Sequence, residues 1–198
     1  FTDNFRLFLL ANSAVRLPTF TDLYYKSATQ IANPDLQPES AKTIELGTKF
    51  EKKNLKFSGA LFYRMGGNVI DWVKEPDSTR WESRNLTEVN VFGIDFSTEY
   101  RFQTSFIKKL ALSYSFLIMD KSAGSYDSKY ALDYLRNKLI LSADHNLYKS
   151  LDASWKLSYV DRAGDYTDFK TAAKTNYEPY FMADVRLQWS KINYDLYL

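Results

Sequence analysis

Residues 110–119 have the sequence LALSYSFLIM, in which large apolar side chains fall at every second position from Leu110 to Ile118. Successive side chains of a β-strand point to opposite faces, so this period of two predicts a strand with one apolar face. The same alternation gives apolar faces within residues 44–50, 57–63, 94–100, 139–143, 151–159 and 181–189. The opposite phase contains charged residues, namely Glu45, Lys49, Asp95, Glu99, Asp152, Lys156, Asp184 and Arg186. The sequence therefore predicts an all-β protein built from two-faced strands.

The connections between these strands alternate between short and long. Short turns are expected near residues 51–54, 103–107, 146–150 and 190–191. Long polar segments are expected at residues 12–40, 66–89, 120–133 and 161–178, and Gly66-Gly67-Asn68 is interpreted as a turn within the second of them. In an up-and-down antiparallel meander, all the short turns then lie at one end and all the long loops at the other. Outer-membrane β-barrels have this asymmetry.

Strand length and aromatic content also favour a transmembrane barrel. Several of the alternating segments exceed ten residues, whereas strands of water-soluble proteins average about five to six. The chain has 15 Tyr, 14 Phe and 4 Trp, many of them near the expected strand ends, where aromatic rings suit the boundary between lipid and water. The mean hydropathy is only −0.40, as expected for strands that alternate between lipid and water. We expect about nine strands, the last of them incomplete, in a chain that is part of a longer polypeptide.

The composition argues against most other functions. The 26 basic and 24 acidic residues give a net charge of +2, which provides no basic surface for nucleic acid. There is no Cys, and the single His excludes most metal and acid–base chemistry. Ser142, Asp144 and His145 cannot form a hydrolytic triad, because on one strand His145 points away from the other two. Asp161, Asp165 and Asp168 do not follow the spacing of a calcium loop. We therefore expect no catalytic residue, no metal and no cofactor.

Residues 16–47 contain a more specific pattern. Residues 16–23 read RLPTFTDL, residues 33–39 read NPDLQPE and residues 43–47 read TIELG, while Asn85 is followed by VFGID at residues 91–95. This ordered set resembles the barrel of TonB-dependent outer-membrane receptors across the whole chain. The residues that carry the resemblance are Arg16, Pro18, Asn33, Pro34, Leu36, Pro38, Glu39 and Gly93. Because proline fixes φ and cannot donate a ladder hydrogen bond, we expect this passage to shape a loop first and to contact ligand second.

The resemblance implies that residues 1–198 are part of a barrel of about 22 strands in the bacterial outer membrane, whose plug domain and closing strands are absent from this sequence. It implies import of a bulky, scarce nutrient, with energy from the TonB complex acting through the plug, and a surface lipoprotein as a possible partner. Passages 68–72 and 81–93 look most similar to the cobalamin receptor branch, and siderophore receptors share most of these residues. The expected ligand contacts are the aromatic loop residues Tyr24, Tyr25, Trp72, Trp81, Tyr126, Tyr166 and Tyr177.

Two other classes of protein remain open at this point. A soluble β-sandwich could bind carbohydrate through exposed aromatic rings, and its apolar strand faces would then pack against each other in two layers. An outer-membrane hydrolase would need a nucleophile and a base on one face. In the barrel interpretation, the apolar faces contact lipid and the charged faces line a wet interior or contact a plug.

Overall fold

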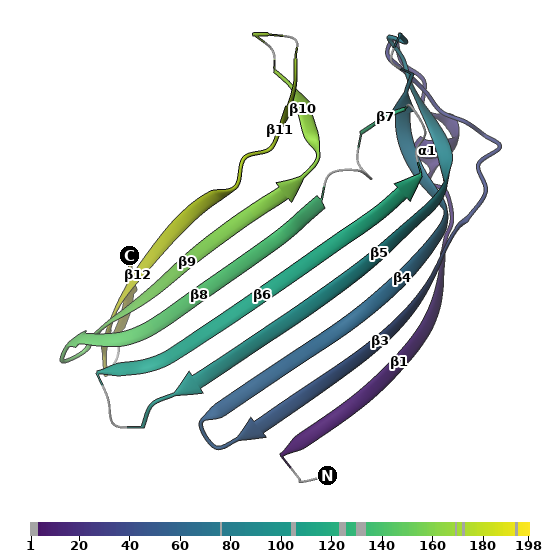
Figure 1. Ribbon diagram of the computed structural model, residues 1–198. Coiled ribbons are helices and arrows are strands. Elements are labelled where there is room, and N and C mark those ends of the chain that lie inside the picture. The colour runs from purple at the N-terminus through teal and green to yellow at the C-terminus, as the bar shows by residue number, and fades with distance from the viewer. Residues whose placement is uncertain are drawn as a thin grey trace.

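The protein folds as one curved antiparallel sheet, seen from its convex side in Figure 1. The computed structural model describes residues 4–75, 77–103, 106–122, 126–129, 134–168, 170–171, 173–192 and 194–198, with only the backbone at residues 86, 87, 122 and 167. Within them, nine strands follow one another across the sheet in chain order. These are β1 (Phe5–Arg16), β3 (Glu39–Lys52), β4 (Leu55–Lys74), β5 (Trp81–Arg101), β6 (Ile107–Ser122), β8 (Tyr134–Tyr148), β9 (Leu151–Ala163), β12 (Tyr180–Lys191) and β13 (Tyr194–Tyr197). The antiparallel meander is confirmed.

The smaller elements all belong to the long loops. The helix α1 (Phe20–Tyr24) and strand β2 (Gln30–Ile31) lie between β1 and β3, and β7 (Asp127–Ser128) lies between β6 and β8. The hairpin of β10 (Asp165–Thr167) and β11 (Lys174–Asn176) lies between β9 and β12. Among the described residues, no helix has the length and apolar character needed to cross a membrane. The opposite end of the sheet, called here the short-turn end, has only tight connections, and the end with these elements is called the long-loop end (Figure 1).

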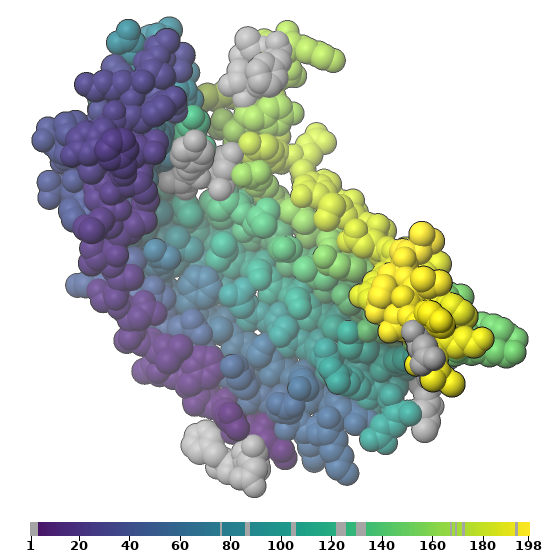
Figure 2. Space-filling model, turned by 180° about the vertical axis from the view of Figure 1, so that it is seen from behind, coloured from purple at the N-terminus to yellow at the C-terminus, as the bar shows by residue number. Residues whose placement is uncertain are grey.

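Strand pairing places the alternating apolar residues of neighbouring strands on the same face, although some apolar residues, such as Phe8 and Phe62, lie on the other face. Leu61, for example, pairs with Leu46 on β3 and with Ile94 on β5, and Leu157 pairs with Leu141 on β8 and Ala183 on β12. The charged residues of the opposite phase share the other face, which is hollowed out: the edge strands stand toward the viewer in Figure 2 and the middle strands recede. The convex face is therefore apolar, and the concave face contains the charges.

The apolar face is not covered by another part of the described chain. Leu61 is 46% exposed and Leu157 is 49% exposed, although both lie near the middle of long strands. A β-sandwich would bury such side chains between two layers, so the sandwich alternative is wrong. Lipid is the medium in which an uncovered apolar band of this length is stable. Backbone N–H and C=O groups are paired between neighbouring strands, so few backbone groups need water as a partner. The sheet is the wall of part of a transmembrane barrel.

Two glycines of the concave face lie directly beneath phenylalanine rings. Phe8 of β1 pairs with Gly47 of β3, and Phe62 of β4 pairs with Gly93 of β5. A Cβ atom built on Gly47 would lie 2.1 Å from Cζ of Phe8, and one built on Gly93 would lie 2.1 Å from Cζ of Phe62. Each ring therefore occupies the space that a side chain on the neighbouring strand would take. This packing explains Gly93, which the sequence marked only as part of a motif.

The structure corrects the prediction for residues 66–89. The alternation of short and long connections is confirmed, but most of this segment is strand rather than loop, because β4 and β5 run for 20 and 21 residues and pair as far as Val73 and Glu82. Gly66, Gly67 and Asn68 lie within β4, so the expected turn there is wrong. The two strands extend beyond the rest of the sheet as an arm, formed by residues 69–74 and 81–88. Residues 104–105, 123–125 and 130–133 of the other expected connections lie outside the described residues.

A charge introduced on the convex face should block assembly of the parent protein. An arginine or lysine near the middle of the lipid-facing band costs about 2–4 kcal/mol. Leu157→Arg should therefore impair folding much more than Ser154→Lys, because Ser154 lies on the concave face opposite Arg186. Heat-modifiable migration in gels measures the folded fraction of each variant. Equal defects in the two variants would contradict the assignment of faces.

The glycines beneath rings give a second prediction. Gly93→Ala should destabilise the barrel by about 1–3 kcal/mol, because the Phe62 ring has to move. Gly59→Ala is the matched control, since a Cβ there meets its nearest neighbour at an ordinary 3.5 Å. The double variant Gly93→Ala with Phe62→Ala should lose less stability than the two single variants together, as measured by unfolding in urea from lipid vesicles. Strict additivity would contradict the packing argument.

Candidate functional site

The candidate site lies at the long-loop end, where loop segments far apart in sequence are fixed to the arm. The first of them, residues 17–38, contains Pro18 and the short helix α1 near its start. Thr19 caps this helix: its hydroxyl accepts a hydrogen bond from the Asp22 N–H at 3.2 Å, and its own N–H donates to the Asp22 carboxylate at 3.0 Å. Both halves of a capping box are therefore present. The motif residues around Pro18 give the loop its local shape.

An ion pair closes the base of this loop. The Arg16 guanidinium donates two hydrogen bonds to the Glu39 carboxylate, at 2.6 and 2.7 Å, across the pair that joins the end of β1 to the start of β3. Glu39 also accepts a hydrogen bond from the Ile70 N–H at 2.6 Å, which ties the loop base to the arm. Bidentate pairs of this kind combine strength with a fixed geometry. Arg16 and Glu39 are thus structural residues of the loop.

The ion pair also sets the protonation of Glu39. Burial raises the pKa of the Glu39 carboxyl, but the hydrogen bonds from Arg16 and Ile70 and the positive charge of Arg16 outweigh burial, so its pKa lies below the usual range. A carboxyl with a lowered pKa stabilises the folded form above its ordinary pKa, and this contribution is lost as the pH falls through the lowered value. The loop base is therefore closed at neutral pH and weakened in acid.

Two side chains of the arm hold the rest of the loop through its backbone. Ser83, which is fully buried, accepts a hydrogen bond from the Asn33 N–H at 2.8 Å and donates one to the Asp22 carbonyl at 2.7 Å. Asn85 exchanges two hydrogen bonds, each of 2.9 Å, with the N–H and carbonyl of Gln37. No sequence pattern indicated Ser83, because its partners lie 50 and 61 residues away in the chain.

The other motif residues of the loop support this attachment. Leu36 is buried at 7% exposure, and Pro34 and Pro38 flank it at the surface. The Asn33 side chain accepts a hydrogen bond from the Asp35 N–H at 2.9 Å, which forms a local turn. The motif between Asn33 and Glu39 therefore shapes the loop, so that backbone groups of Asn33 and Gln37 can bond to the arm.

The seven aromatic residues expected to contact ligand fall into two groups. In the first, Tyr24 packs on Phe20 with ring centroids 5.1 Å apart, and Tyr25 meets Trp72 edge-on at 6.4 Å. Tyr24 and Tyr25 are about half exposed, whereas Trp72 is only 6% exposed. Trp72 therefore serves mainly as the base on which Tyr25 rests.

The second group lines a cleft between the arm, β7 and the β10–β11 hairpin. Its volume is about 270 Å³, and its lining includes Trp81, Tyr126 and Tyr166. Tyr177 lies beside it and packs on Tyr166 at 5.3 Å. The cleft thus brings together three of the expected aromatic residues from three separate loop segments, with the fourth in contact with one of them.

Cations surround the aromatic rings of this cleft. The Lys74 and Lys129 ammonium groups lie 5.3 and 5.9 Å from the Trp81 ring centre, and Lys121 and Lys174 complete the basic lining. Arg84 covers the Tyr126 ring at 5.0 Å, and its Nη1 donates a 2.6 Å hydrogen bond to the Tyr126 hydroxyl. Acidic groups are present too, since Asp127 pairs with Lys174. The sequence did not indicate these cations, because they come from distant segments. Rings stacked with cations can bind planar, electron-rich or anionic groups.

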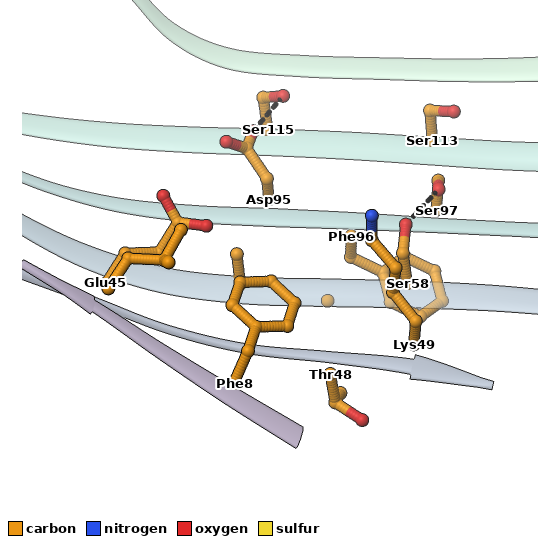
Figure 3. A pocket seen from close by; sticks show the side chains of 13 residues that line it. Phe8, Glu45, Thr48, Lys49, Ser58, Asp95, Phe96, Ser97, Ser113 and Ser115 are labelled. Carbon is orange, nitrogen blue, oxygen red and sulfur yellow. Dashed lines mark hydrogen bonds between the residues drawn. The ribbon is translucent and has the colours of Figure 1, made fainter. Parts of the chain in front are cut away.

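Two further hollows lie on the concave face. The larger, shown in Figure 3, has a volume of about 660 Å³ and a mixed lining of apolar and polar side chains, in which Ser115 donates to Asp95 at 2.6 Å and Ser58 bonds Ser97 at 2.7 Å. The other, of about 490 Å³, lies nearer the long-loop end and has an apolar lining that includes Phe62, Val91 and Met119. The wet, charged interior expected from sequence is thus only part of this face.

The structure offers no hydrolytic centre at His145. Ser142 and Asp144 pair with neighbours on the concave face, while His145 lies on the convex face, where it accepts a 2.8 Å hydrogen bond from the Trp155 indole. Asp161, one of the three loop aspartates, is engaged by Arg136 at 2.9 Å. Among the described residues, no three His, Cys, Asp or Glu side chains lie close enough to hold a metal ion.

Breaking the base of the first loop should release it without unfolding the barrel. Glu39→Gln removes the charge from hydrogen bonds worth about 1.5–3 kcal/mol, so amide exchange at Asn33 and Gln37 should accelerate at least tenfold. Wild type should approach the exchange rate of the variant as the pH falls below the usual range of a glutamate, after correction for the intrinsic exchange rate. Arg80→Gln, an exposed change on the same side of the molecule, is the control. Identical amide exchange in both variants at neutral pH would show that the Arg16–Glu39 ion pair does not hold the loop.

The sequence and the fold were compared with those of known proteins. A family model described as "TonB dependent receptor-like, beta-barrel" matches residues 1–198. The vitamin B12 transporter BtuB of Vibrio vulnificus (strain YJ016) is 28% identical over 93 residues, which are 47% of this chain and 14% of that protein. The chain therefore spans only a small part of the length of this relative.

Solved structures share the fold at low sequence identity. The copper transporter OprC superposes with a TM-score of 0.75 and 12% identity over 100% of this chain and 31% of its own. The ferric-catecholate import receptor Fiu from Escherichia coli K12 has a TM-score of 0.68 and 20% identity over 99% of this chain and 28% of its own. The FrpB iron transporter from Neisseria meningitidis has a TM-score of 0.66 and 14% identity over 96% of this chain and 31% of its own. With the family match over the full length, these likenesses lead to one conclusion: the chain belongs to the TonB-dependent receptor β-barrel family.

Proposed function

We propose that this chain is part of an outer-membrane receptor that imports a bulky, scarce nutrient with energy supplied through TonB. The observation that carries the proposal is the uncovered apolar convex face, which requires a lipid environment on one side of a single sheet. In this proposal the short-turn end faces the periplasm and the long-loop end faces the exterior. The plug domain and the closing strands of the barrel belong to other parts of the parent protein, and a surface lipoprotein is a further possible partner.

The barrel wall in this proposal performs no covalent chemistry. The loop segments capture the ligand, the concave face contacts the plug and the passing ligand, and the driving force comes from the inner membrane. The apolar hollow near Phe62 and Met119 suits a packed contact, whereas the serine-rich hollow suits a hydrated path. Because the long loops are fixed to one another through the arm, the capture site has a defined shape before ligand binds, which lowers the entropy lost on binding.

Cobalamin is our first choice of ligand. The passages 68–72 and 81–93 that look most similar to cobalamin receptors include most of the arm, which contributes Trp72 to the first aromatic group and Trp81 to the second. The vitamin B12 transporter of Vibrio vulnificus is also similar in sequence over about half of this chain. A large, flat ring system of the cobalamin type could lie against exposed rings such as Tyr24 and Tyr25.

An iron–siderophore complex is the alternative, and a specific observation favours it. The cleft around Trp81 has three lysines and two aspartates in its lining, and a fourth lysine, Lys129, lies over the same ring. Many iron complexes of this kind carry negative charge, which such a cleft would attract. Several proteins with the same fold are described as iron or siderophore receptors.

Uptake assays with the full-length receptor separate these ligands. The receptor would be expressed in a host that lacks its own cobalamin and siderophore receptors, with and without TonB. Growth on limiting cobalamin, dependent on TonB, would support the first choice, and growth only on ferric siderophores would support the alternative. Growth with neither class of ligand, in cells that assemble the receptor, would contradict the proposed function.

Single substitutions then identify the contact residues. Trp81→Ala should weaken ligand binding about tenfold or more if the cleft is the capture site, because buried aromatic contacts dominate binding energy. Tyr24→Ala should have that effect if the first aromatic group is used instead. Tyr180→Ala changes an exposed ring at the same end that contacts neither group, and binding should remain as in wild type. Titration of purified receptor by intrinsic fluorescence measures the three dissociation constants.

A further inference from the structure

Four exposed lysines mark the short-turn end of the sheet. Lys53 and Lys149 occupy the first positions of two tight turns, while Lys52 and Lys191 lie at the ends of β3 and β12. Lys52 pairs with Leu55 of the convex face, and Lys191 follows Trp189 by two residues and shares its face. Within the part of the chain that the structure describes, none of the four forms an ion pair with a carboxylate.

Four of the cations at the same end that reach toward the concave face are paired, whereas Arg6 and Lys49 have no carboxylate partner among the described residues. The pairs are Lys56 with Glu51, Arg101 with Glu99, Lys108 with Asp152 and Lys109 with Asp144, with nitrogen–oxygen distances of 2.6–2.7 Å. These four inward cations are neutralised within the protein, whereas the charge of the four lysines at the turns and on the convex side is not. This difference calls for an anionic partner outside the sheet.

Aromatic rings accompany two of the four lysines. The Lys149 ammonium lies 5.0 Å from the centre of the Tyr148 ring, and the Lys191 ammonium lies 6.0 Å from that of Trp189. Tyr148 is 66% exposed and Trp189 is 39% exposed, next to the apolar band that begins with Leu151. A ring with a polar edge beside a long cationic chain is typical of the boundary between acyl chains and headgroups.

The backbone conformation of the two turns also supports an interaction of these lysines outside the sheet. Lys53 and Lys149 both have a φ of 44°, in the left-handed region that favours glycine and asparagine. In the two turns, an asparagine and a serine follow these lysines, so the strained position is the one given to the cation. Two separate turns therefore accept the same unfavourable conformation and hold an ammonium at the tip.

The boundary at the other end of the convex face has no such excess. Its outward residues are Lys42, Glu88, Asn90 and Asp120, which are of mixed charge. The excess of positive charge is therefore specific to the short-turn end.

We propose that Lys52, Lys53, Lys149 and Lys191 form a basic fringe that binds anionic phospholipid headgroups of the membrane leaflet at the short-turn end. The inference rests on the proposed function only in so far as the parent protein spans a membrane. The fringe continues the lipid-facing band, and its charge complements the phosphate of phosphatidylglycerol. Such contacts would fix the depth and tilt of the barrel wall.

The experiment measures lipid selectivity in the full-length receptor. The receptor is reconstituted into phosphatidylcholine vesicles with increasing phosphatidylglycerol, and quenching of its tryptophan fluorescence by brominated lipids gives the relative affinity for the two lipids. The wild-type receptor should prefer phosphatidylglycerol about fivefold, because a lysine near an anionic surface contributes about that factor. The triple variant Lys53→Gln, Lys149→Gln and Lys191→Gln should reduce the preference nearly to one, and about 1 M salt should do the same to wild type.

The matched control removes the same charge from the concave face. The variant Lys49→Gln, Lys138→Gln and Lys156→Gln should keep the wild-type preference, because these residues do not face lipid. An equal loss of the phosphatidylglycerol preference in both triple variants, or no such preference in wild type, would contradict the proposal. If the wild-type receptor prefers phosphatidylglycerol but imports no nutrient, the result contradicts the proposed function and leaves the fringe proposal standing. If the fringe variant fails to fold, the salt dependence of the wild-type preference still decides the question.

Discussion

A sheet that has lipid on one side and water on the other must keep every strand in register with its neighbours. A shift by one residue would move all the apolar side chains of a strand to the wet face and all its charges into lipid. Strand pairing holds the rows that contain Leu61 and Leu157 at constant height across the sheet. The packing of Phe8 on Gly47 and of Phe62 on Gly93 then adds contacts that fit only in this register. Loops and hollows are positioned by a wall whose alignment cannot vary.

The two ends of this wall differ in how their polar groups are satisfied. At the long-loop end the protein satisfies its own groups: Ser83 and Asn85 hold a loop through backbone hydrogen bonds, and Glu39 is held by Arg16 and Ile70. At the short-turn end four inward cations have carboxylate partners, while the four outward lysines have none among the described residues. In the proposed function, the first arrangement gives a preshaped surface for capture, and the second leaves charge available for the surrounding membrane.

The sequence predicted the regular part of this structure because alternation is a local property. The strand of residues 110–119, the face of Leu157 and the tight turn after Lys52 all follow from neighbouring residues. The arm was missed because consecutive residues of β4 from Ile70 to Val73 are all buried, so both faces are covered there and its residues need not alternate. The same limit applies to the cleft. Trp81, Tyr126 and Tyr166 could be picked out as aromatic loop residues, but the lysines that surround them come together only through contacts across about 100 residues of sequence.

The attachment of loops to the arm has a consequence for how such a surface can evolve. Ser83 and Asn85 contact backbone atoms rather than side chains of residues 22–37. Exposed side chains along the loop can therefore be exchanged freely while the anchors remain. Under selection by phages or antibodies, the exposed side chains of the loop could therefore change while its backbone geometry stays the same.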